Sequence, residues 1–303
     1  MGFINRNDII STHNLTIMQR RNFIKSAGIT AAAMAIAPQL FAEKKTRALG
    51  VQLYTIRDAI AKDLTGSLER LSKLGYNEVE LFGYNGTFFG KTPKEFANIC
   101  NGLGLKPISG HYLSGRVGNA PGTLVNGWQK AIDDAAELNL KYMVCAWLPP
   151  AERTLDQYKT LPALLNTSAE ACAKSGIQFC YHNHDFEFDQ LEGTMPYKHI
   201  LQNTDAEKVK MEVDLYWVSK ANQDPVALFE NNPGRFPLWH VKDKQSDTGV
   251  FAEVGKGNIN FDKIFAARKT AGLKHWFVEQ DVCKGDPFDS LAISKEYVTG
   301  KKY

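Results

Sequence analysis

The sequence is poor in cysteine and has no excess of charge of either sign. Its five cysteines, among 303 residues, are widely spaced and form no C-x-x-C pair, so we expect neither a disulfide framework nor a cysteine-based zinc site. The 36 basic and 33 acidic residues nearly balance, which gives no electrostatic argument for a nucleic-acid partner or an anionic membrane surface. Composition therefore favours an ordinary globular protein, with 44% apolar residues available for its core.

Long apolar runs are also missing, which bears on the N-terminus. The pair Arg20-Arg21 precedes a modestly apolar segment at 27–37, and small residues follow it. This segment is shorter than the ~20 residues of a spanning helix, whereas a charged region, a short apolar core and small residues make an export signal. We expect residues 1–42 to be a twin-arginine-type signal that directs the chain to the periplasm without membrane insertion. An ordinary amphipathic helix is the alternative, and Met18 is a second candidate start beside the first residue.

Short β-type runs alternate with amphipathic helical stretches from residue 48 onward. Four helical stretches end in a glycine just before the next apolar run, as helices often do. Eight such strands match a closed barrel of eight βα units, and no proline- or serine-rich linker divides the chain. We therefore predict a single (β/α)8 TIM barrel of the α/β class over 48–300. A doubly wound open sheet is disfavoured, because no G-x-G-x-x-G turn follows the first strand.

The expected elements follow from these patterns. Strands are predicted at 49–54, 78–81, 107–110, 142–146, 177–181, 210–213, 237–241 and 276–279. Helices are predicted at 64–74, 92–103, 128–138, 155–175 and 261–271.

Histidines and carboxylates gather where the predicted strands end. In a TIM barrel these ends meet at one mouth, where catalytic residues lie. Within the run FCYHNHDFEF at 179–188, His182 and His184 fall on the same face of a strand. Buried charges are costly unless paired or bound to a metal. A ring of such residues therefore predicts a mixed nitrogen and oxygen site for manganese, zinc, cobalt or magnesium. The strand ends supply Tyr54, Glu80, His111, His182, His184, Glu187, Glu212, Asp214, His240, Lys242, Glu279 and Asp281.

A family likeness is carried by seven segments: GVQLYTIRD at 50–58, VELFGY at 79–84, YHNHDFEF at 181–188, MEVDLYWV at 211–218, WHVKDK at 239–244, EVGKGNINF at 253–261 and WFVEQD at 276–281. In this order they resemble the xylose-isomerase-like barrel superfamily of sugar and sugar-phosphate isomerases and epimerases. That superfamily also contains inosose dehydratases and endonuclease-IV-type enzymes. The resemblance implies a TIM barrel with one divalent metal, usually manganese, that acts on a small sugar or cyclitol.

The resemblance also implies roles for individual residues. Asp214, His240 and Glu279 match metal ligands, and His182 stands where epimerases of the superfamily have a glutamate. Those epimerases use two glutamates as acid and base on opposite faces of the substrate, and only Glu279 of that pair remains here. Glu279 is therefore expected to be both ligand and base, with the second proton-transfer group among His184, Lys242, Glu187 and Glu80. His184 and Lys242 are the main catalytic candidates beside Glu279, and the expected substrate contacts are Tyr54, Glu80, His111 and Glu187.

Several functions share this chemistry. The leading hypothesis is a metal-dependent sugar isomerase or epimerase that removes a proton next to a carbonyl. Export disfavours a phosphorylated substrate, so a lyase or dehydratase acting on a keto-sugar, a 3-keto-glycoside or an inosose is the alternative. A nuclease of the endonuclease IV type would need more histidine ligands and a basic face, so no nucleic acid is expected. A non-catalytic sugar-binding barrel is the remaining hypothesis, and a homodimer is compatible with each.

Replacing Arg20 and Arg21 by lysine should impair export of the full-length chain, because the paired arginines address the protein to the twin-arginine route. Cell fractionation measures the exported share. Replacing Lys44 and Lys45 by arginine, beyond the signal, is the matched control. Undiminished export of the Arg20→Lys, Arg21→Lys variant would remove the twin-arginine prediction.

Overall fold

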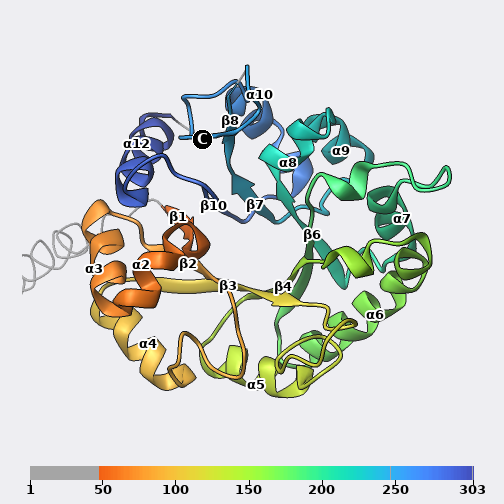
Figure 1. Cartoon of the computed structure of the whole chain (residues 1–303), viewed down its shortest axis with the longest axis horizontal. Helices are drawn as coiled ribbons and strands as arrows, with labels where there is room; N and C mark the ends of the chain where they lie inside the picture. The colour runs from red at the N-terminus through yellow and green to blue at the C-terminus, as the bar shows by residue number, and fades with distance from the viewer. Residues whose placement is uncertain (1–47, 246, 302) are drawn as a thin grey trace, which may run out of the picture. The chain divides into compact units, whose positions relative to one another are not determined.

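Eight parallel strands close into a barrel in the computed structural model (Figure 1), in the order β1-β10-β7-β6-β5-β4-β3-β2. The model describes residues 48–303 except 246 and 302, so the predicted export signal lies outside the described residues. The predicted TIM barrel is confirmed. The barrel strands are β1 (Gly50–Gln52), β2 (Glu78–Leu81), β3 (Lys106–Leu113), β4 (Tyr142–Trp147), β5 (Gln178–His182), β6 (Val209–Asp214), β7 (Leu238–Val241) and β10 (His275–Val278).

The first strand is shorter than predicted, and the difference moves Tyr54. Strand β1 ends at Gln52, whose side-chain oxygen accepts a hydrogen bond from the backbone N–H of Tyr54 at 3.0 Å. This contact starts the 3-10 helix η1 (Leu53–Ile56), which turns the chain out of the sheet. The prediction of strand through Tyr54 is therefore wrong, and Tyr54 lies at the rim instead. Strand β3, in contrast, runs on past the predicted end and includes His111.

Helices surround the ring of strands (Figure 1). The predicted glycine stops are present: Gly75 ends α3 with φ 93° and Gly272 ends α11 with φ 82°. The predicted helix at 261–271 divides at Ala267 into two. No helix among the described residues is long and apolar enough to cross a membrane. The helices are α2 (Arg57–Lys62), α3 (Leu64–Leu74), α4 (Pro93–Gly102), α5 (Trp128–Glu137), α6 (Leu155–Lys174), α7 (Pro196–Asn203), α8 (Leu215–Lys220), α9 (Pro225–Asn231), α10 (Phe261–Ala266), α11 (Arg268–Ala271) and α12 (Pro287–Gly300), with the 3-10 helices η2 (Pro150–Glu152) and η3 (Phe186–Phe188).

The barrel interior changes from apolar to ionisable along each strand. Side chains two residues apart on a strand point to the same face, so each strand places successive side chains in successive layers. The lower layer is a small apolar cluster, and the larger core lies between the sheet and the helices. Above the cluster, β5, β7 and β10 continue with polar side chains on the same inward face. The successive pairs are Cys180 and His182, Leu238 and His240, and Phe277 and Glu279.

A short hairpin after β7 is held by one carboxylate. Strands β8 (Asp243–Lys244) and β9 (Phe251–Ala252) pair antiparallel. The buried carboxylate of Asp243 accepts backbone N–H bonds from Gly255, Gly257 and Ile259 at 2.9, 2.9 and 3.1 Å. These bonds fix the returning segment against β8. A Cβ at Gly257 would collide with Asp243 Oδ1 and with the carbonyl oxygen of Lys244.

Gly257→Ala should lower the free energy of unfolding by about 1–3 kcal/mol, the usual cost of forcing atoms into a packed site. Gly285→Ala is the matched control, because a Cβ there meets nothing within 4 Å. Urea denaturation of both variants measures the difference. Equal stability of the two would show that the loop yields to the extra methyl group without loss of the Asp243 bonds.

Candidate active site

A cavity of about 840 Å³ opens at the C-terminal mouth of the barrel. Of the predicted ligands, His182 and Glu279 line it, while Asp214 and His240 lie directly beneath with no exposed surface. Glu80 and Glu187 are also fully buried and are absent from its lining. The predicted residues that line the cavity are Tyr54, His111, His182, His184, Lys242 and Glu279.

The four predicted metal ligands converge at the cavity floor. Donor atoms of Asp214, His240 and Glu279 all lie within 4.8 Å of one another. Asp214 Oδ2 is 3.7 Å from His240 Nδ1 and 3.8 Å from His182 Nε2. Donors that share one metal at ~2.1 Å lie roughly 3–3.5 Å apart. The set therefore closes on a metal with small movements, although His240 Nδ1 and Glu279 Oε2 now share a 2.6 Å hydrogen bond.

The ammonium group of Lys242 lies among the same oxygens. Its Nζ is 2.9 Å from Asp214 Oδ2, 2.7 Å from Glu279 Oε2 and 3.0 Å from Asp281 Oδ1. Burial alone would lower the pKa of Lys242, but these three carboxylates outweigh it and raise the pKa well above its usual value. Burial would raise the pKa of Glu279, and the charges of Lys242 and His240 lower it instead. A metal bound to Asp214 and Glu279 would have to displace this ammonium group.

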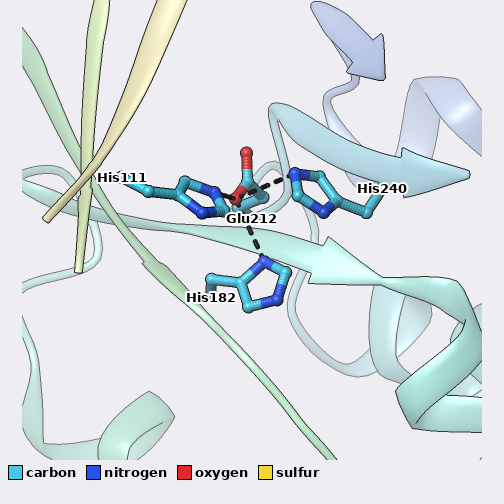
Figure 2. A group of neighbouring side chains, drawn as sticks. All are labelled: His111, His182, Glu212 and His240. Carbon is cyan, nitrogen blue, oxygen red and sulfur yellow. Dashed lines mark hydrogen bonds and ion pairs between the residues drawn. The ribbon is translucent and has the colours of Figure 1, made fainter. Parts of the chain in front are cut away.

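A second polar layer lies under the ligands and orients them. Figure 2 shows the rings of His111, His182 and His240 directed at Glu212, whose Oε2 lies 2.7, 3.0 and 3.3 Å from their nearest nitrogens. Glu80 Oε2 is 2.5 Å from His240 Nε2. Each predicted histidine ligand thus has a carboxylate on the nitrogen that faces away from the predicted metal position, an arrangement that fixes ring orientation in metal sites.

Protonation of the two histidine ligands differs. Burial holds the pKa of His182 well below its usual value, and the positive charges of His240 and Lys242 lower it further. This ring is therefore neutral and can bind a metal. Burial would also lower the pKa of His240, but Glu212, Glu279 and Glu80 raise it well above the usual value. A metal bound at His240 Nδ1 would displace a proton from that nitrogen.

The carboxylates at the cavity floor and in the layer beneath it provide the negative charge that a divalent cation requires. Three buried carboxylate oxygens have no hydrogen-bond partner, namely Glu80 Oε1, Glu212 Oε1 and Asp214 Oδ2, although Asp214 Oδ2 is ion-paired with Lys242. Unpaired buried charge is unfavourable unless it is neutralised. A second group (His111, His182, Glu212 and His240) also has clustered donor atoms, but it offers one carboxylate, whereas the upper group offers two, Asp214 and Glu279. The residues present therefore fit a divalent metal best at the upper group, with His182, Asp214, His240 and Glu279.

His184 and Glu187 take separate positions above β5. His184 lines the cavity, and its Nδ1 is buried without a partner. Burial, with the charge of Lys242, holds the pKa of His184 well below its usual value, so the ring is neutral. Glu187 turns away in η3 and accepts hydrogen bonds from Tyr181 Oη at 2.8 Å and from the His184 backbone at 2.7 Å. Glu187 thus fixes the His184 segment from below, and its predicted substrate contact has no support in this geometry.

Glu80 and Glu212 orient the histidine rings, a role that the sequence analysis did not predict for either residue. Glu80 was expected to contact substrate, yet it lies below the cavity against His240 and receives a 2.9 Å hydrogen bond from Gln52. Glu212 had no assigned role. The available signal was its spacing, two residues before Asp214 on the same face of β6.

The chain matches the model of the xylose isomerase-like TIM barrel family over residues 68–288. It belongs to this family. Among solved structures, a sugar phosphate isomerase/epimerase from Parabacteroides distasonis is 29% identical, with a TM-score of 0.75 over 86% of this chain and 96% of that one. The IOLI protein with a bound zinc atom is 14% identical, with a TM-score of 0.63 over 84% of this chain and 97% of that one, and shows the fold alone.

Curated relatives of this xylose isomerase-like barrel are named inosose dehydratase. The protein from Lacticaseibacillus casei is 26% identical over 165 residues, 48% of this chain and 55% of that protein. The one from Geobacillus thermodenitrificans is 24% identical over 165 residues, 48% of this chain and 55% of that protein. The chain spans about half the length of these relatives.

Lys242→Met should destabilise the metal-free protein by about 3–5 kcal/mol, because Asp214, Glu279 and Asp281 lose their buried counter-ion. The same change should strengthen Mn²⁺ binding, since no ammonium group competes for the carboxylates. Thermal unfolding with EDTA and with Mn²⁺ measures both effects, and exposed Lys263→Met is the control. A Mn²⁺-induced rise in Tm that is equal in parent and variant would place the metal and the ammonium group at different positions.

Glu187 predicts a pH dependence of stability. Burial raises its pKa to about 7 in the folded protein, against about 4.3 in an unfolded chain. Between these values the folded state binds more protons than the unfolded state, so stability falls as pH rises through the window. Glu187→Gln removes this titration, and its stability relative to the parent should rise by about 3 kcal/mol between pH 4 and 8. Urea denaturation across this range tests it, with exposed Glu137→Gln as control; parallel curves for parent and Glu187→Gln would refute it.

Proposed function

We propose that this protein is a divalent-metal-dependent enzyme that removes a proton next to the carbonyl of a sugar or cyclitol, as a sugar isomerase or epimerase. The main support for this proposal is that His182, Asp214, His240 and Glu279 converge at the floor of a large cavity. Membership of the xylose isomerase-like family supports the same chemistry. When bound there, the metal would act as a Lewis acid on the carbonyl and its neighbouring hydroxyl.

The residues of the chain supply the proton transfers. Glu279 lines the cavity and is held ionised by Lys242 and His240, so its carboxylate is the base. Lys242 Nζ lies 2.7 Å from that carboxylate and also lines the cavity. His184 offers a neutral ring with an unpaired Nδ1. Lys242 and His184 are the groups that return a proton to the substrate.

A lyase or dehydratase acting on a keto-sugar, a 3-keto-glycoside or an inosose is the second candidate. The observation that favours it is the position of the acid relative to the base. Lys242 follows β7 and Glu279 follows β10, which are neighbouring strands, so both reach the substrate from one side. One base and one adjacent acid suit removal of a proton and an oxygen leaving group, whereas epimerisation by two bases needs opposite faces. The inosose dehydratase relatives point the same way.

Manganese is the proposed ion, with zinc, cobalt or magnesium as alternatives, because histidine and carboxylate ligands suit each of them. Periplasmic location is proposed from the sequence of residues 1–42 alone. Neither a nucleic-acid partner nor membrane insertion is part of the proposal.

Glu279→Gln should lower turnover by the ~10²–10⁴-fold typical of losing a general base, while Mn²⁺ affinity falls modestly because one carbonyl ligand is kept. Incubation with Mn²⁺ and a panel of ketoses, inososes and 3-keto-glycosides in deuterated water measures turnover and deuterium incorporation. Exchange between aldose and ketose supports the isomerase, and loss of water or of an aglycone supports the lyase.

Glu78→Gln is the matched control, because Glu78 also pairs with a histidine, His275 at 2.8 Å, but lies outside the cavity lining. Near-normal turnover by metal-loaded Glu279→Gln would leave Glu279 as a ligand only. Absence of turnover by the parent with the whole panel would favour a sugar-binding barrel without catalysis.

A further inference from the structure

A continuous wall of ring and guanidinium planes rises from the cavity floor to its rim. The ring centroids of His182 and His184 are 5.0 Å apart, and His184 stacks on Phe186 at 5.1 Å with an interplanar angle of 13°. Arg153 Cζ lies 3.6 Å over the Phe186 ring and 5.4 Å from the Trp147 ring. The wall thus leads from a predicted metal ligand to Trp147, which is 39% exposed.

A second aromatic face stands across the mouth. Tyr54 is 40% exposed and packs edge-on against Phe82 at 5.3 Å. Arg57 covers the Tyr54 ring at 4.4 Å and is fixed by hydrogen bonds to the carbonyl oxygens of Tyr54 and Asp281. Because Tyr54 follows β1 and Trp147 ends β4, two strands, β2 and β3, separate the two faces around the barrel. The rim therefore presents two large exposed rings with a gap between them.

The cavity is larger than one sugar ring requires. Its volume of about 840 Å³ lies near the upper end of the ~300–1,000 Å³ of small-molecule sites. A ring that reacts at Glu279 fills only the floor, which leaves the space between Trp147 and Tyr54. Exposed aromatic faces gain free energy when a flat, apolar ring face covers them.

We infer that the rim between Trp147 and Tyr54 binds a second ring, a sugar or an aryl group, joined to the ring that reacts at the floor. The inference rests on the proposed function only for where the reacting ring lies. A phosphate group is the competing occupant, but both guanidinium groups at the rim are already held against the walls, through Nε of Arg153 and Nη1 of Arg57. Arg153 is hydrogen-bonded to the Leu148 carbonyl oxygen and lies against Phe186, and Arg57 is hydrogen-bonded to two carbonyl oxygens.

Calorimetric binding of unreactive ligands to the full-length, Mn²⁺-loaded protein tests the inference. The ligands are the methyl glycosides of glucose, glucose 6-phosphate, cellobiose and maltose, which cannot open to a carbonyl form and are named below by their sugar, and the two anomers of phenyl glucoside. At least one two-ring ligand should bind about tenfold more tightly than glucose. Tighter binding of the disaccharides identifies a sugar at the rim, and tighter binding of the phenyl glucosides identifies an aryl group.

Trp147→Ala should remove this tenfold difference and leave glucose affinity unchanged, whereas Trp147→Phe should keep most of it. Ile293→Ala, an exposed apolar change on α12 outside the cavity, should alter nothing. The inference is overturned if no two-ring ligand binds more tightly than glucose, if glucose 6-phosphate binds most tightly, or if Trp147→Ala keeps the two-ring preference. Because the ligands do not react, this result is independent of whether Glu279→Gln loses turnover.

Discussion

Compensation of buried negative charge is the constraint on which the centre of this barrel depends. Glu80, Glu212, Asp214 and Glu279 are at most 4% exposed. The ammonium group of Lys242 neutralises Asp214 and Glu279. The protonated rings of His240 and His111 neutralise Glu80 and Glu212. Neighbouring Glu80 and Glu212 raise the pKa of His111 to about 9, which outweighs its burial. Removing one partner from such a network leaves a buried charge that costs several kcal/mol.

The same charge compensation links the stability of the metal-free protein to the proposed metal binding and catalysis. The bonds that neutralise the carboxylates in the metal-free protein are made by the same atoms that a metal and a substrate would use. Lys242 Nζ is bound to Asp214 and Glu279, and His240 Nδ1 is bound to Glu279. A divalent cation can replace both interactions because it brings more positive charge to the same oxygens. Its arrival would free the ammonium group of Lys242 for the substrate, and the cation would keep Glu279 ionised in place of that group.

The barrel was predictable from sequence because its signals are local. Apolar runs, glycine stops such as Gly75 and polar strand ends all lie within a few residues of the elements that they mark. The convergence of strand ends followed from the fold. The hydrogen-bond partners did not, because they join strands far apart in the chain: Glu80 and His240 are 160 residues apart. The predicted substrate contact of Glu187 was not found, because the chain turns into η3 after His184 and carries this side chain away from the cavity. Strand periodicity gives no sign of this turn.

The histidine on the fifth strand has a physical consequence for the reaction. A glutamate at His182 would add a carboxylate to a floor that already holds Asp214 and Glu279, whereas a neutral ring binds a metal without adding charge. The negative charge on this side instead lies one layer deeper, in Glu212, which accepts from the His182 ring. After the fifth strand the cavity is lined by one carboxylate, Asp185, and that group is paired with Lys220 at 2.9 Å. A single carboxylate base with a lysine on the neighbouring strand would suit proton transfer on one side of the substrate, as in aldose–ketose isomerisation or loss of a leaving group, better than inversion between two matched bases.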